Sequence, residues 1–236
     1  MSIKMILFDL DGTLLPMDQN VFIKTYFGAL VKKLLPHGYD AKQLVDVIWQ
    51  GTAAMVANDG DRFNEEVFFD VFRGVYGDRA QTDKHFFDEF YQNDFDREVR
   101  VSCGYNEKAR LTLDKIKAKG YRVALATNPL FPSLATEYRI AWAGFSPDYF
   151  ELFTTYENSR HCKPSLDYYR EVIEKLGVDA EECLMVGNDV SEDMIASKLG
   201  MKVFLLTDCL INKSDEDISH YPSGSFDELL EYINEL

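Results

Sequence analysis

The chain has 236 residues, of which 46% are hydrophobic, and this suits one large domain with an insert, or two small domains. A formal net charge of −15 disfavours nucleic acid and anionic membranes as partners, and no stretch reaches the roughly 18 apolar residues of a membrane span. Because the first residues also lack a signal-peptide pattern, we expect a cytoplasmic protein that binds neither nucleic acid nor membrane.

The first predicted element is a short buried strand at Met5–Phe8, which ends in two carboxylates one residue apart. Side chains alternate along a strand, so Asp9 and Asp11 point the same way if the backbone stays extended. Gly12 then permits a tight turn before Thr13. Two carboxylates this close repel each other unless a cation lies between them or one keeps a proton. The pattern therefore favours a Mg²⁺ site, divided catalytic roles, or both.

Residues 17–96 show helical periodicity and almost no strand signal. Apolar residues fall on one face of four predicted helices, which cover 22–34, 44–56, 64–75 and 82–91. Asn64 is a candidate N-cap for the third of these helices. Aromatic residues in this region recur at i, i+4 spacing, which predicts that most of them pack against one another. We therefore expect a small helical bundle.

The rest of the chain alternates strands with helices. The predicted strands cover 122–126, 152–154, 183–186 and 202–206. The predicted helices cover 107–119, 165–176, 192–199 and two segments that begin at 133 and 225. Such alternation implies an α/β fold with a doubly wound, Rossmann-like parallel sheet. The predicted core domain comprises residues 1–16 and 97–236, and the helical bundle at 17–96 is inserted after the first strand.

Three side chains are candidates for binding a substrate. Thr127 and Asn128 directly follow the predicted strand at 122–126, and ligands of parallel sheets bind at the carboxyl ends of strands. The Thr127 hydroxyl could bond a phosphate oxygen, and Asn128 could do the same or orient a substrate. Lys163 precedes Pro164 at a predicted turn into a helix. The alternatives are an ordinary turn for the first pair and a solvated surface lysine for the third residue.

A second group of side chains with oxygen ligands follows the apolar strand at 183–186. Asn188, Asp189 and Asp193 come after the strand and the glycine that ends it. Oxygen atoms at a strand end suit a hard dication such as Mg²⁺, and a charged oxygen suits it best. A charged turn exposed to solvent is the alternative interpretation.

The segment Asp9-Leu10-Asp11-Gly12-Thr13 resembles motif I of the haloacid dehalogenase (HAD) superfamily of phosphohydrolases. Thr127 after its strand resembles motif II, Lys163-Pro164 resembles motif III, and Asp189 with Asp193 resembles motif IV, in the order that the family needs. The family carries a mobile C1-type cap at the place where residues 17–96 are inserted. The resemblance therefore covers the whole chain.

The fourth motif departs from the family pattern at one position. The family more often has glycine directly before the first acid, whereas Asn188 intervenes in this sequence. Either Asp189 is the metal ligand, or Asn188 offers its amide oxygen and Asp189 stands one position away. We favour Asp189, because a hard dication prefers a charged oxygen. Asp193 is expected close to the metal.

The resemblance implies a Mg²⁺-dependent phosphomonoester hydrolase that acts on a small phosphorylated metabolite. Asp9 would attack phosphorus and form an aspartyl-phosphate, while Asp11 would protonate the leaving alkoxide and later take a proton from water. Mg²⁺ would contact Asp9, the backbone carbonyl of Asp11, and Asp189. Thr127 and Lys163 would cover the other phosphoryl oxygens. The cap would exclude water and recognise the leaving group.

Alternative functions share parts of this sequence pattern. The dehalogenase branch of the family lacks the second acid, so Asp11 favours phosphate chemistry. Phosphonate hydrolysis would need a cap lysine that forms a Schiff base, and the lysines of 17–96 fall on polar helix faces. A phosphomutase uses the same core but protects the phosphoenzyme from water. A non-catalytic scaffold that binds phospho-ligands or a protein partner would not need an intact Asp9, Asp11 and Lys163.

Overall fold

A five-stranded parallel sheet forms the centre of the structure, a computed structural model that describes residues 2–236. Every strand is parallel to its neighbours, in the order β2-β1-β3-β4-β5. The strands are β1 (Met5–Phe8), β2 (Arg122–Leu125), β3 (Cys183–Gly187), β4 (Lys202–Leu206) and β5 (Ser223–Gly224). The first strand lies between β2 and β3, so later strands are added on both of its sides. The predicted doubly wound, Rossmann-like α/β fold is confirmed.

Helices cover both faces of the sheet, and the residues of β1 show why. Ile6 and Phe8 lie in a cluster with residues of α7 (Glu107–Ala118), α8 (Ser133–Trp142) and α10 (Phe226–Asn234). Met5 and Leu7 lie in a second cluster with residues of α9 (Leu166–Leu176) and the 3₁₀ helix η6 (Met194–Leu199). Successive side chains of a strand point to opposite faces, so a strand covered on both sides has to be apolar throughout.

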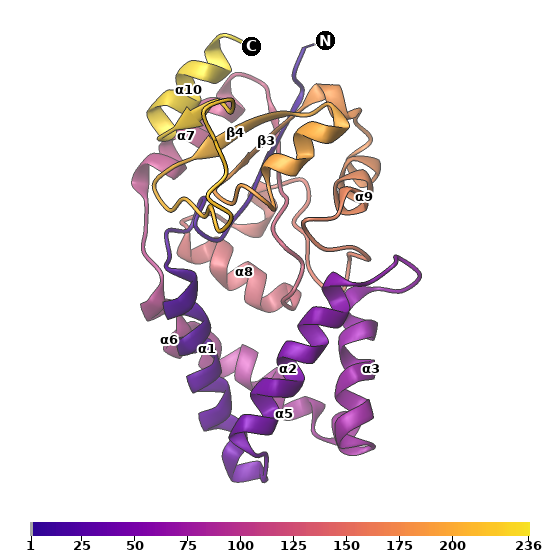
Figure 1. The fold of residues 1–236 in the computed structure, drawn as a ribbon. Helices are drawn as coiled ribbons and strands as arrows, with labels where there is room; N and C mark the ends of the chain where they lie inside the picture. The colour runs from indigo at the N-terminus through magenta and orange to yellow at the C-terminus, as the bar shows by residue number, and fades with distance from the viewer. Residues whose placement is uncertain (1) are drawn as a thin grey trace.

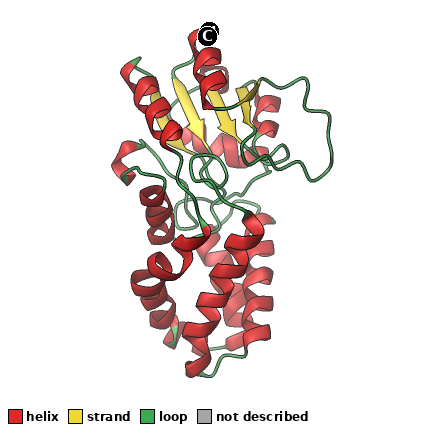
Figure 2. Ribbon diagram, turned by 90° about the vertical axis from the view of Figure 1, so that its left-hand side faces the viewer, coloured by secondary structure: helices red, strands yellow, loops and turns green. Residues whose placement is uncertain are grey.

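Residues 19–102 are helical and extend away from the carboxyl ends of the strands (Figures 1 and 2). The α-helices are α1 (Gln19–Leu34), α2 (Ala41–Val56), α3 (Asn64–Tyr76), α4 (Arg79–Thr82), α5 (Lys84–Glu89) and α6 (Phe95–Val99). Shorter turns are the 3₁₀ helices η1 (Leu35–His37) and η3 (Arg100–Ser102) and the π-helix η2 (Phe90–Asp94). The core adds the 3₁₀ turns η4 (Pro147–Tyr149) and η5 (Ala180–Glu182). The division predicted between residues 96 and 97 falls inside α6.

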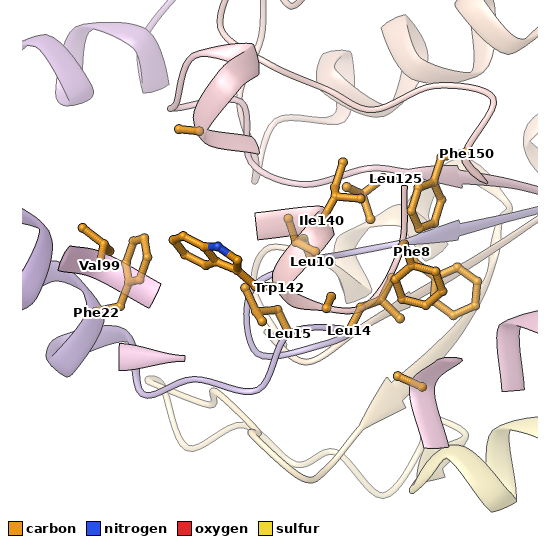
Figure 3. Close-up of a cluster of buried hydrophobic side chains, with 14 of the residues drawn as sticks. Phe8, Leu10, Leu14, Leu15, Phe22, Val99, Leu125, Ile140, Trp142 and Phe150 are labelled. Atoms are coloured by element: carbon orange, nitrogen blue, oxygen red, sulfur yellow. The ribbon is translucent and has the colours of Figure 1, made fainter. Parts of the chain in front are cut away.

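The helical part joins the sheet part through two neighbouring connections. Met17 and Cys103 form an antiparallel bridge, and the Gly104 amide donates to the Pro16 carbonyl at 2.7 Å. Buried side chains continue from the sheet into the helices without a break, and Figure 3 follows them from Phe8 and Leu125 to Trp142, Val99 and Phe22. A shared apolar layer thus connects the two parts.

Three local predictions need correction. The strand expected at 152–154 is a single bridge between Leu125 and Phe153, because the chain bends at once into the turn that follows. Asn64 is the first residue of α3 and not its N-cap, and its side chain is bonded to the core instead. The helix expected at 192–199 is a 3₁₀ helix that starts at Met194. Within residues 2–236, no helix is both long and apolar enough to cross a membrane.

Candidate active site

The side chains singled out in the sequence meet at the carboxyl edge of the sheet. Figure 2 shows the strands pointing toward the loops that separate the sheet from the helical part. Asp9 follows β1, Thr127 lies two residues after β2, and Asn188 follows β3. These three strands are neighbours in the sheet, so their ends lie side by side. The loop before α9 adds Lys163 from across the site.

Asp9 is the centre of a buried hydrogen-bonded cluster. Its Oδ1 accepts from Lys163 Nζ at 2.9 Å, and its Oδ2 lies 3.2 Å from the Thr13 hydroxyl. Lys163 Nζ also donates to Asp193 Oδ1 at 2.6 Å. The side chain of Lys163 is fully buried, and Asp9 is 8% exposed. Lys163 thus fixes one oxygen of the Asp9 carboxylate, and the Thr13 hydroxyl lies beside the other.

The electrostatics of this cluster keep Lys163 charged. Burial alone would lower the pKa of Lys163, but the carboxylates of Asp193 and Asp9 outweigh burial and hold this pKa well above its usual value. Burial raises the pKa of Asp193 to about 7, against the opposing effect of Lys163. When both acids are ionised, two carboxylates face one ammonium. The buried cluster therefore carries an excess negative charge that favours a cation.

Asn188 reaches toward Asp9, whereas Asp189 is bonded elsewhere. The Asn188 Oδ1 lies 2.9 Å from the Thr13 hydroxyl, and its Nδ2 donates to the Cys209 carbonyl at 2.7 Å. The Asp189 Oδ1 accepts from the amide and hydroxyl of Ser191 at 2.9 and 2.7 Å. A ligand role for Asp189 stays a prediction, and these contacts support Asn188 better as the oxygen donor beside Asp9.

Gly12 makes the approach of Asn188 possible. Its φ of +82° is in the left-handed region that disfavours other residues, and a Cβ at this position would overlap the amide of Asn188. The glycine of motif I is therefore needed both for the turn and for the packing of β3 against it.

Asp11 forms its own ion pair, with a residue that the sequence analysis missed. Arg139 of α8 donates through a guanidinium nitrogen to Asp11 Oδ2, and the arginine side chain is 1% exposed. Burial raises the pKa of Asp11, while Arg139 opposes this shift. The signal in the sequence was an arginine on the apolar face of α8, between Ala135 and Ile140. A cation on such a face needs a buried partner.

Two predicted site residues hold buried oxygens without a partner. Asp11 Oδ1 and Asn128 Oδ1 receive no hydrogen bond from any described residue. The Asn128 Nδ2 donates to Glu192 Oε2 at 3.1 Å, so Glu192 is a second residue that the sequence analysis missed. Buried acceptors without partners are rare, and they mark places where a donor or cation is needed. Both orphaned oxygens belong to the candidate active site.

Thr127 is anchored through its backbone. Its carbonyl accepts from the hydroxyls of Thr154 at 2.6 Å and Tyr168 at 2.8 Å, which fixes the loop after β2. Within residues 2–236, the Thr127 hydroxyl itself makes no hydrogen bond to a protein group. The hydroxyl is available to donate to a bound anion, and that role stays a prediction.

The residues present fit Mg²⁺. The Asp9 carboxylate and the Asn188 amide oxygen both lie beside the Thr13 hydroxyl, and such hard oxygens would suit the ion. In residues 2–236, no group of three or more His, Cys, Asp or Glu forms a metal cage by itself. Mg²⁺ usually keeps several waters and binds one or two carboxylates together with substrate phosphate, so a complete cage is not required.

The haloacid dehalogenase-like hydrolase family model matches residues 3–199. The glyceraldehyde 3-phosphate phosphatase of Methanocaldococcus jannaschii is 26% identical over 238 aligned positions, which cover 99% of this chain and 98% of that protein. Pyrophosphatase PpaX of Bacillus velezensis is 23% identical over 197 residues, which cover 84% of this chain and 80% of that protein.

A solved structure of a 2-haloacid dehalogenase from Pseudomonas syringae pv. Tomato superposes with a TM-score of 0.66 at 21% identity and covers 99% of both chains. At this identity the likeness concerns the fold. The family model spans most of the chain and includes Asp9, Asp11, Thr127, Lys163 and Asn188. This protein belongs to the haloacid dehalogenase-like hydrolases.

Proposed function

We propose that this protein is a Mg²⁺-dependent phosphatase that hydrolyses a small phosphomonoester through an aspartyl-phosphate on Asp9. The observation that carries the proposal is the arrangement around Asp9 at a strand end, where Lys163 holds one carboxylate oxygen and the Thr13 hydroxyl lies beside the other. A carboxylate fixed in this way is positioned for attack on an electrophile. The phosphatases among the relatives support phosphate as the group transferred.

The roles of the other residues follow from their positions. Lys163 and the free Thr127 hydroxyl would neutralise and orient the phosphoryl oxygens. Asp11, whose Oδ1 has no partner, would donate a proton to the leaving alkoxide and then accept one from the attacking water. Bound Mg²⁺ would offset the charge of the phosphate against the acidic cluster and align it for in-line attack. Asp9, Asn188 and the Asp11 carbonyl would hold the ion, with Asp193 and Asp189 nearby.

The test is Mg²⁺-dependent release of phosphate from p-nitrophenyl phosphate. Wild type should hydrolyse the ester, and Asp9→Asn should lower kcat by at least about 10³-fold, as expected when a nucleophile is removed. Asp78→Asn is the matched control, because Asp78 is exposed and its side chain makes no helix-capping bond. Equal rates for wild type and Asp9→Asn would reject the proposal and favour a non-catalytic scaffold. Circular dichroism would verify that each variant is folded.

A further inference from the structure

A cavity of about 460 Å³ lies between the helical part and the loop after β2. Helices α1 and α2 diverge below α8 in Figure 1, and the lining residues come from these two helices, from α3, α5 and η2, and from residues 130–137 and 156–157. Its volume is within the range of sites for small organic ligands, about 300 to 1,000 Å³. It lies outside the cluster around Asp9.

The wall of the cavity is mainly apolar and rich in aromatic rings. The rings that line it include Tyr26, Phe27, Trp49, Phe69, Tyr91 and Phe131. Several of these rings already touch one another, with 5.6 Å between the centroids of Phe27 and Trp49 and 5.3 Å between those of Tyr26 and Phe131. Trp49 is nevertheless 47% exposed. An aromatic surface left open to solvent is a favourable place for an apolar ring.

The charged groups of the cavity disfavour an anion. Four carboxylates line it, from Glu65, Asp88, Glu137 and Glu157. Lys84 is the one cation among the described lining residues, and its Nζ lies 3.4 Å from Glu65. Glu157 already accepts a hydrogen bond from the Ser133 amide at 2.9 Å. A second phosphate or a carboxylate on a ligand would therefore meet negative charge and no free cation.

The cavity ends close to the catalytic acids. Phe131 follows Asn128 by three residues, and its ring centroid lies 4.6 Å from the guanidinium carbon of Arg139. Arg139 is in turn bonded to Asp11. Phe131 thus belongs to the wall of the aromatic cavity and also lies beside the arginine that holds Asp11, the residue that would protonate the leaving group. An alcohol attached to a phosphate on Asp9 would extend toward this cavity.

We propose that the cavity binds the alcohol part of the substrate, and that this alcohol carries an apolar, ring-sized body without a second anionic group. The inference rests on the proposed phosphatase function and names its substrate class. Polyanionic phosphates such as pyrophosphate or nucleotides fit this lining poorly. The chemistry of the cavity differs in this respect from what the name of the pyrophosphatase relative would suggest.

The test compares three phosphomonoesters of primary alcohols, which have similar leaving groups: ethyl phosphate, 2-phenylethyl phosphate and its para-carboxylated analogue. We expect kcat/KM for 2-phenylethyl phosphate to exceed that for ethyl phosphate by about 10- to 100-fold, the gain from burying a phenyl ring. The carboxylated analogue should lose most of this gain. Trp49→Ala and Phe69→Ala should reduce the phenylethyl-to-ethyl ratio by about fivefold or more. Leu111→Ala, an exposed residue of α7, should leave it unchanged.

The outcomes separate this inference from the proposed function. Asp9-dependent hydrolysis of p-nitrophenyl phosphate with a phenylethyl-to-ethyl ratio near one, or with the carboxylated ester preferred, would overturn the inference and leave the phosphatase intact. If no ester is hydrolysed, the phosphatase proposal fails, and binding of 2-phenylethanol is then measured by calorimetry. Saturable binding that Trp49→Ala abolishes would support an apolar ligand site, and its absence would reject one.

Discussion

At the level of single residues, Arg139 controls the environment of the Asp11 carboxylate. Besides its bond to Asp11, the guanidinium donates to the Ala135 carbonyl at 3.2 Å and to the Thr136 hydroxyl at 3.1 Å. Its position is therefore fixed by its own helix, and Asp11 is held against a cation that cannot swing away. A positioned acid beside a nucleophile is what proton transfer to a leaving group needs.

The Arg139–Asp11 pair should contribute to stability as well as to positioning. We expect Arg139→Gln to lower the free energy of unfolding by about 2–4 kcal/mol, because it leaves a mostly buried carboxylate without its partner. In an Asp11→Asn background the loss should be smaller by about 1–3 kcal/mol. Urea unfolding in the presence of EDTA measures both values. Arg170→Gln, which breaks an exposed ion pair with Asp167, should cost less than about 1 kcal/mol. If the stability losses from Arg139→Gln and Asp11→Asn simply add in the double variant, the result would argue against an interaction between these two residues.

At the level of elements, the end of β3 and the turn after it form one unit. Gly187 is the last residue of β3, and the carboxylate of Asp193 packs directly over it. The Asp193 Oδ2 accepts from the Asp189 amide at 3.0 Å, while its Oδ1 holds Lys163. The turn thus folds back so that the carboxylate of Asp193, four residues after Asp189, reaches the site.

A methyl group at Gly187 should disrupt this unit. The Cβ of Gly187→Ala would overlap the Asp193 carboxylate and lie 2.6 Å from the Asp193 Cβ, so we expect a loss of about 1–3 kcal/mol in unfolding free energy. Gly28→Ala is the matched control. Gly28 is exposed inside α1 with nothing within 4 Å, so alanine there should stabilise by about 0.5–1 kcal/mol. Urea midpoints compare the two variants, and a stable Gly187→Ala would contradict this packing.

At the level of the whole molecule, the helical part and the sheet part meet over the acidic site. Asn64 at the start of α3 is fully buried and donates to the Cys162 sulfur at 3.3 Å, next to Lys163. Arg160 donates to the Gly60 and Asp61 carbonyls in the turn after α2. These contacts connect the loop that carries Lys163 with the helices that line the aromatic cavity.

At the same scale, we expect Mg²⁺ to stabilise the whole molecule against unfolding. Because the ion would bind the folded acidic cluster only, Mg²⁺ at about 100 times its Kd should add about 2.7 kcal/mol to the unfolding free energy and raise the Tm by several degrees. Thermal unfolding of EDTA-treated protein with and without Mg²⁺ measures the shift. Asn188→Ala should reduce it more than Asp189→Ala does, as the contacts of the two residues suggest. An unchanged Tm in wild type would count against a metal site here.

Much of the fold could be predicted because its signals are local. The alternation of apolar strands and amphipathic helices gave the parallel sheet, and glycine or serine marked several helix ends, as Gly177 and Ser225 show. The strand predicted at 152–154 was wrong because the segment forms only one bridge to β2, at Phe153, before the chain bends into the turn that follows. Asparagine is a residue type that favours the N-cap position, but the side chain of Asn64 makes a buried tertiary contact instead.

The sequence by itself determined the family pattern, the parallel sheet, and the placement of Asp9, Thr127 and Lys163 at the carboxyl edge of that sheet. These could be predicted because strand periodicity and motif spacing are properties of residues that are near one another in the chain. Only the tertiary structure decided which side chains meet. Arg139 on Asp11, Glu192 on Asn128 and the contact between Asn188 and Thr13 join residues far apart in the chain. Their pairing depends on distances and burial that arise when the strands and helices pack, so no local pattern encodes them.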